Sequence, residues 1–186
     1  MTVTRSRLAL GIVAAIAAII PASVSAAVAQ NTAAGCNASG AMTWTATTTS
    51  YRVQLHVGIS EKMYTPAEVK KLHPKSGEVM IGGTMGMGSD MSMPSTSMHH
   101  LEVQICSKQT GAVIANAKPT ITLADNSMGA MMAKKLPVAM MLGIGHGIED
   151  FHYGNNVTMP SGHKLTVKVA LNGETATFRL QLPKGA

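Results

Sequence analysis

A chain of 186 residues is long enough for one ordinary domain with a hydrophobic core and too short for two large ones. The net charge is +6, but the 15 basic residues are scattered, and the chain has only one Trp, three Tyr and two Phe. Without a basic cluster or an aromatic stacking surface, this composition argues against nucleic acid as a partner.

Residues 1–29 have the pattern of a signal peptide. Arg5 and Arg7 precede an apolar stretch, and small side chains at 27–29 offer a cleavage site. We therefore expect an exported protein that is periplasmic, associated with the cell envelope or secreted. A retained membrane anchor is the alternative, because the apolar run approaches the length of a membrane span. The letters AAGC ending at Cys36 are faintly similar to a lipidation box, but they lie well beyond the apolar stretch.

The chain has two cysteines, Cys36 and Cys106. An even number of cysteines in an exported protein predicts a disulfide. Two metal-binding thiolates would be the alternative in a reducing compartment.

Residues 30–50 are expected to form a weakly structured lead, and residues 51–186 the folded domain. Within 44–59 the sequence predicts one or two strands, since apolar and polar side chains alternate from Tyr51 to Val57.

A short helix is predicted next. Thr65 can cap it, Pro66 suits its first position, and Glu68 stands three residues after the cap. Pro74 should end it.

The segment 79–98 is predicted to be a flexible Met-rich loop, because its Gly and Ser content does not favour a helix. Thioethers are soft, uncharged ligands that suit Cu(I). The candidate auxiliary Cu(I) ligands are Met85, Met87, Met91, Met93 and Met98. A linker that binds nothing is the alternative.

Short alternating segments separated by Gly and Pro continue to the C-terminus. The last two flank Asn172-Gly173, a dipeptide favoured in tight hairpin turns. Many short strands at regular spacing predict an all-β protein with a β-sandwich fold and one short helix. A glycine-rich phosphate loop, a nucleophile elbow and a helical zinc motif are all absent from the sequence, so the common enzyme classes that carry them are disfavoured.

The letters HHLEVQIC predict a strand with two different faces. Leu101, Val103 and Ile105 share one face, and His100 and Glu102 share the other. Residues two apart on a strand are about 6.5–7 Å apart, so an imidazole and a carboxylate can reach one ion from the same side. A solvated polar face is the alternative.

A second unusual stretch, DFHYGNNVTM, presents His152 from a polar turn. Upstream lie Met140, Met141 and His146. Adjacent residues on a strand face opposite ways, so one methionine of the pair is expected to pack in the core and only the other can be a ligand.

These motifs resemble a known family. HLE at 100–102, and HYGNN at 152–156 followed by MPSGHKLTVKV, are similar to the periplasmic copper-binding proteins associated with ferrous-iron permeases, an iron-transporter family. The resemblance covers roughly residues 98–172. It implies an immunoglobulin-like antiparallel sandwich that forms dimers. It also implies a copper site built from the His-x-Glu pair, the His of the His-Tyr-Gly turn, a Met on the preceding strand and a further His.

Carried over to this chain, the resemblance assigns His100, Glu102 and His152 to the copper site, together with Met140 or Met141. The chain departs from the family in two places.

The segment between the methionine pair and His152 is longer here. The loop that carries the family's last His is replaced by the tight Asn172-Gly173 turn. Either His146 or His99 then substitutes for that ligand, or the site has fewer ligands.

The sequence therefore favours an exported copper-binding protein that handles Cu(II) and Cu(I), with iron as a second candidate cargo. It would act as a carrier in copper handling or in copper-linked ferrous iron uptake, with a membrane iron or copper permease as partner and a homodimer as its assembly. A copper-dependent redox enzyme that oxidises ferrous iron or removes superoxide is one alternative, and it would need an open coordination position. A structural surface domain is the other.

Overall fold

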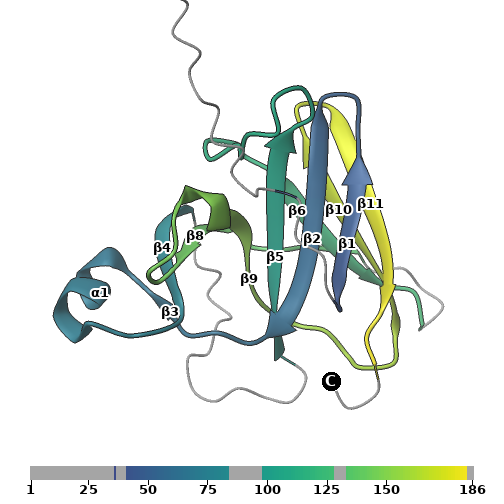
Figure 1. Ribbon diagram of the computed structural model, residues 1–186. Coiled ribbons are helices and arrows are strands. Elements are labelled where there is room, and N and C mark those ends of the chain that lie inside the picture. The colour runs from purple at the N-terminus through teal and green to yellow at the C-terminus, as the bar shows by residue number, and fades with distance from the viewer. Residues whose placement is uncertain (1–35, 37–40, 84–97, 128–132, 184–186) are drawn as a thin grey trace, which may run out of the picture. The chain divides into compact units, whose positions relative to one another are not determined.

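The computed structural model describes residues 36, 41–83, 98–127 and 133–183, which form two β-sheets with one short helix beside them (Figure 1). The strands are β1 (Thr43–Thr47), β2 (Tyr51–Ile59), β3 (Met63–Tyr64), β4 (Glu78–Gly83), β5 (Met98–Ser107), β6 (Thr120–Asp125), β7 (Ala133–Lys135), β8 (Ala139–Gly143), β9 (His152–Thr158), β10 (Lys164–Leu171) and β11 (Glu174–Gln181). Helix α1 spans Pro66–Leu72, and the 3-10 turn η1 spans Ile148–Asp150. The predicted all-β sandwich with one short helix is confirmed.

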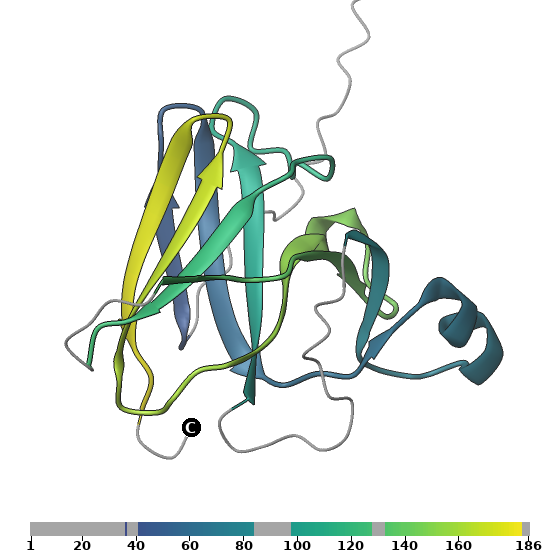
Figure 2. The ribbon, with the colours of Figure 1, turned by 180° about the vertical axis from the view of Figure 1, so that it is seen from behind.

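The larger sheet has the strand order β1-β2-β5-β9-β8-β4-β3, and the smaller has the order β11-β10-β6-β7. The pairs are antiparallel except for β3 and β4, which run parallel. The two sheets enclose the core, as the view from behind also shows (Figure 2). Leu101, Val103 and Ile105 of β5 are buried in it, as the predicted alternation requires. His100 and Glu102 consequently face away from the smaller sheet.

Two boundaries differ from the sequence-based expectation. Residues 30–50 are not all weakly structured, because β1 lies within them and pairs along its full length with β2. The Thr-rich composition of β1 suits this strand pairing. The predicted loop 79–98 is also shorter, since its first residues belong to β4 and Met98 opens β5. The signal peptide at 1–29 and the methionines Met85, Met87, Met91 and Met93 lie outside the described residues.

Local sequence signals set the helix and the last hairpin. The Thr65 hydroxyl accepts from the Glu68 N–H, and the Glu68 carboxylate accepts from the Thr65 N–H, a reciprocal cap. Asn172 and Gly173 both adopt positive φ (49° and 80°) in the predicted turn between β10 and β11.

Among the described residues, no helix is long and apolar enough to cross a membrane.

The predicted disulfide between Cys36 and Cys106 is confirmed. It links a residue that precedes β1 to the far end of β5. The Cys36 N–H also donates to the Gln104 side-chain oxygen at 2.6 Å, so two contacts hold this segment on the larger sheet.

Removing the disulfide should weaken the fold. The two cysteines are 70 residues apart, and in the chain-entropy model a loop of that length contributes about 4 kcal/mol. The double variant Cys36→Ser/Cys106→Ser should therefore unfold at lower denaturant concentration, and reductant should affect the wild type but not the variant. Equal unfolding midpoints for both proteins would show that the disulfide contributes nothing to stability.

Candidate metal centre

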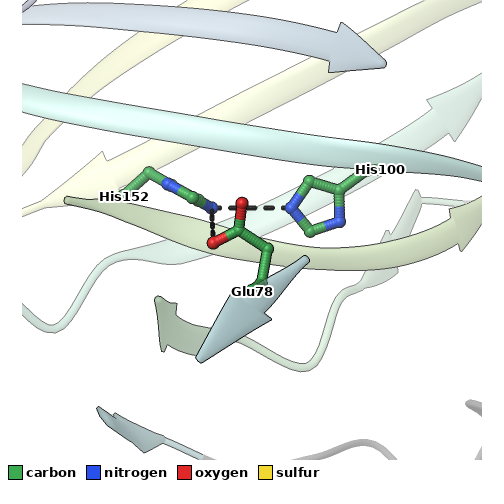
Figure 3. Close-up of side chains that lie close together, drawn as sticks. All are labelled: Glu78, His100 and His152. Carbon is green, nitrogen blue, oxygen red and sulfur yellow. Dashed lines mark hydrogen bonds and ion pairs between the residues drawn. The ribbon is translucent and has the colours of Figure 1, made fainter. Parts of the chain in front are cut away.

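The larger sheet brings together side chains from two neighbouring strands, β5 and β9, and from the more distant strand β4. Glu78 on β4, His100 on β5 and His152 on β9 each place a ligand atom within 4.8 Å of the others (Figure 3). Strands β5 and β4 stand three places apart in the sheet order. On a flat sheet with upright side chains, the side chains of two such strands would be about 14 Å apart. The sheet must therefore curl between β5 and β4, so that Glu78 faces the two histidines.

Gly154 lies where the ladder of β9 with β5 overlaps the ladder of β9 with β8. It is opposite Glu102 in the ladder with β5 and opposite Ala139 in the ladder with β8. A Cβ atom on Gly154 would lie 1.8 Å from the backbone oxygen of Leu101, far inside any possible contact. The absence of a side chain thus permits the close approach of β9 to β5 that positions His152.

The orientation of His100 is set by Asn156. The Asn156 side chain is fixed by the backbone of Glu61: its Oδ1 accepts from the Glu61 N–H at 3.1 Å, and its Nδ2 donates to the Glu61 carbonyl at 2.7 Å. The same Oδ1 lies 2.9 Å from His100 Nδ1. Since Oδ1 only accepts, Nδ1 must carry the hydrogen, and Nε2 of the neutral ring keeps its lone pair.

His152 is oriented in the same way by a backbone group. Its Nδ1 lies 2.8 Å from the carbonyl oxygen of Asp150, which can only accept, so Nε2 again bears the lone pair. The two Nε2 atoms face each other at 3.5 Å. Two neutral rings in these tautomers cannot hydrogen-bond to each other, whereas a shared cation would satisfy both lone pairs.

Glu78 supplies the third donor atom. Its Oε2 lies 3.7 Å from His152 Nε2 and is buried without a hydrogen-bond partner among the described residues. These separations are close to those of atoms that share one ion at about 2.0–2.2 Å. Backbone and amide groups that orient ligating histidines are typical of metal sites. The arrangement is therefore a candidate metal centre.

Burial favours the uncharged forms of Glu78 and His152. Burial, reinforced by the negative charges of Glu61, Asp150 and Glu102, raises the pKa of Glu78 to about 8. Burial also lowers the pKa of His152 to about 4. At neutral pH without a metal ion, Glu78 is thus protonated and His152 is neutral. A metal ion bound by Glu78 must displace that proton.

This protonation state predicts a pH dependence. The affinity of the site for a divalent metal ion should fall as pH drops below about 8, by up to about tenfold per pH unit from Glu78 alone, because the Glu78 proton competes with the ion. Competition titrations at several pH values measure how the logarithm of the affinity changes with pH. The slope of this plot should be smaller by about one in Glu78→Gln than in the wild type. The raised pKa of Glu78 also predicts how the stability of the metal-free protein depends on pH. The folded chain holds the Glu78 proton more tightly than the unfolded chain, so the free energy of unfolding should decrease as pH rises from 4.5 toward 8. Identical pH slopes for the two proteins would exclude Glu78 as a ligand.

Two of the histidines expected in a metal site, His100 and His152, lie in this cluster. Glu102 lies on the same face of β5 as His100 but outside the group of three. It is half-buried and stands opposite His56 on β2, and burial raises its pKa. It adds negative charge near the cluster.

The two methionines of the pair face opposite sides of β8, and both are packed against apolar neighbours. Met140 packs against the main core, whereas Met141 pairs across the sheet with His152 and shares its face. Met98, an expected auxiliary ligand, is the half-buried first residue of β5.

The two other candidate histidines lie apart from the cluster. His99 is buried on the opposite face of β5 from His100. His146 is exposed, and its Nδ1 lies 3.5 Å from Asp150 Oδ1. Neither of them takes the place of a missing ligand.

Sequence reasoning missed Glu78. The alternation from Glu78 to Gly82 signals a strand with Glu78 and Met80 on one face, but most of this strand lies within the predicted loop 79–98. Gly77, directly before Glu78, has φ +102°, and a Cβ there would lie 2.6 Å from the Lys62 oxygen. Only glycine fits this turn. The glycine directly before Glu78 was therefore the sequence signal that a new strand begins at Glu78.

Comparisons with known proteins add little to this picture. Neither a protein-family model nor a curated protein matches the chain. A crystal structure of a DUF4426 family protein from Pseudomonas aeruginosa PAO1 is similar over 76% of this chain and 95% of its own, at 13% identity and a TM-score of 0.39. A similarity this low does not define a shared fold or function.

Proposed function

We propose that this protein is exported and binds copper, acting as a carrier in copper handling or in copper-linked ferrous iron uptake. One observation carries the proposal. Two buried imidazole lone pairs and a buried carboxylate oxygen converge on one point, and among the described residues no hydrogen-bond donor satisfies that oxygen. Without a metal ion the Glu78 carboxyl group holds a proton, and a cation that displaces this proton would be bound by all three atoms.

The donor set alone does not select copper. Two histidines and one carboxylate also suit Zn(II) and Fe(II). The preference for copper rests on Met141 beside His152, on the Met-rich segment 79–98, and on the resemblance of the HLE and HYGNN motifs to the copper-binding iron-transporter family. Iron remains the second candidate cargo.

In this proposal Glu78 replaces the last histidine of the family. The chain has the short Asn172-Gly173 turn where the family carries that ligand. A carboxylate from β4 reaches the two histidines from the curled end of the sheet instead. Glu102, the other acidic residue of the family's motif, then contributes charge close to the site.

Burial favours a carrier over an enzyme. Glu78, His100 and His152 are 6%, 0% and 3% exposed. A redox enzyme needs an open coordination position for its substrate. Ligands enclosed to this degree instead suit an ion that is held and then passed to a partner such as a membrane permease, and the confirmed disulfide agrees with an oxidising, exported setting.

Metal analysis of the protein purified from its own export compartment tests the proposal, together with an assay for ferrous oxidation. We expect about one copper per chain at the histidine site and no catalytic turnover. A chain that contains copper and also oxidises ferrous iron over many turnovers would support the redox enzyme. A chain that takes up neither copper nor iron would support a structural surface domain.

A further inference from the structure

A small cluster of buried methionines lies beside the candidate metal centre. It consists of Met63, Met80 and Met141 with Ala139, and it is separate from the main core. The three methionines are 4%, 8% and 0% exposed. They come from β3, β4 and β8, the end of the larger sheet that curls toward the histidines.

Strand register places these methionines on the same face as the metal centre. Met141 stands opposite His152 on β9 and opposite Met80 on β4. Directly opposed residues of antiparallel strands have Cβ atoms about 4.5–5.5 Å apart, so Met141 borders both His152 and Met80. Met63 on β3 is the parallel-strand partner of Glu78 on β4.

Packing alone does not account for this composition. Among the described residues, the main core has 21 buried residues, of which Met159 is the one methionine, and the half-buried Met42 and Met140 pack against it. In the small cluster, three of the four residues are methionines. Leu, Ile and Val fill buried space with better defined rotamers and dominate the main core. A group composed almost wholly of thioethers suggests that sulfur itself is needed there.

We propose that Met63, Met80 and Met141 form a second metal site, selective for soft monovalent ions such as Cu(I) and Ag(I), next to the histidine site. The inference rests on the proposed copper-binding function and extends it. Uncharged thioethers favour Cu(I), whereas imidazole and carboxylate also accept Cu(II). Adjacent soft and borderline sites allow the chain to retain copper in either oxidation state.

Ag(I), a redox-inert probe, tests the proposal. The Met-rich segment would also take up Ag(I), so the background variant carries Met85, Met87, Met91 and Met93 changed to Ser. In that background, Met63→Leu/Met80→Leu/Met141→Leu should bind about one Ag(I) fewer per chain. Leu preserves side-chain volume, so the substitution removes sulfur with little effect on packing. The matched control is Met159→Leu in the main core, which should keep the full Ag(I) stoichiometry.

A second measurement does not depend on how the triple variant folds. With methyl-labelled methionine in the background variant, Ag(I) should shift the resonances of Met63, Met80 and Met141 and leave Met159 unchanged. Unshifted resonances, or an unchanged Ag(I) stoichiometry in a folded triple variant, would overturn the inference. Cu(II) titration separates the two claims: His152→Ala should weaken Cu(II) binding by at least about 100-fold, and the double variant Met63→Leu/Met80→Leu, which keeps Met141, should change Cu(II) affinity less than threefold. If the wild type binds Cu(II) but the methionine cluster binds no Ag(I), only this inference fails. If the wild type binds no Cu(II), the proposed function fails.

Discussion

Replacing His152 with Ala is expected to weaken Cu(II) binding by at least about 100-fold. Loss of groups that merely orient metal ligands typically costs 10–100-fold in affinity, and loss of a ligand should cost more. His152 is the central donor of the cluster, 3.5 Å from His100 Nε2 and 3.7 Å from Glu78 Oε2. A competition titration against a chelator of known affinity measures the change.

The matched control is His163→Ala. His163 also pairs with a carboxylate, at 2.6 Å from Asp125, but it lies beside the smaller sheet, outside the cluster. Its replacement should change Cu(II) affinity less than threefold. Equal affinities for the wild type and His152→Ala would place the copper site elsewhere.

Replacing Gly154 with Ala is expected to destabilise the protein by more than about 3 kcal/mol or to prevent folding. The new Cβ would lie 1.8 Å from the Leu101 oxygen, a backbone atom that cannot move without breaking the ladder of β5 and β9. Steric overlap in the core belongs to the mechanisms that give the largest effects of single substitutions. Denaturant unfolding, or the yield of folded protein, measures the outcome.

Gly58→Ala provides the comparison for this substitution. Gly58 is a strand glycine on β2 that pairs with His100, and a Cβ there would meet only the His56 ring at an ordinary 3.5 Å. We expect a change within about 1 kcal/mol. Similar stabilities for the two variants would mean that β9 tolerates a side chain at Gly154.

Local patterns predicted the parts of the fold and site that depend on neighbouring residues. Alternation along β5 placed His100 and Glu102 on one face, and the opposite orientation of adjacent residues separated Met140 from Met141. The turn at Asn172-Gly173 was predictable because Asn and Gly tolerate the positive φ angles that it requires. With two cysteines in the chain, one pairing was available, and the structure contains it.

The third ligand could not be predicted in this way. Glu78 reaches His152 because the sheet curls across three strand positions, and β4 is held in its place in the sheet by its pairing with β8. Such long-range geometry leaves no periodic signal in the sequence. The resemblance to a known family implied a further histidine, whereas the third member of the cluster is the Glu78 carboxylate.

The metal centre itself is tested most directly by a crystal structure of the copper-loaded protein with anomalous diffraction data collected at the copper edge. We expect one strong anomalous peak about 2.0–2.2 Å from His100 Nε2, His152 Nε2 and a carboxylate oxygen of Glu78. An ordered copper ion at another position, such as His146 with Asp150 or His163 with Asp125, with these three side chains left unbound, would contradict it.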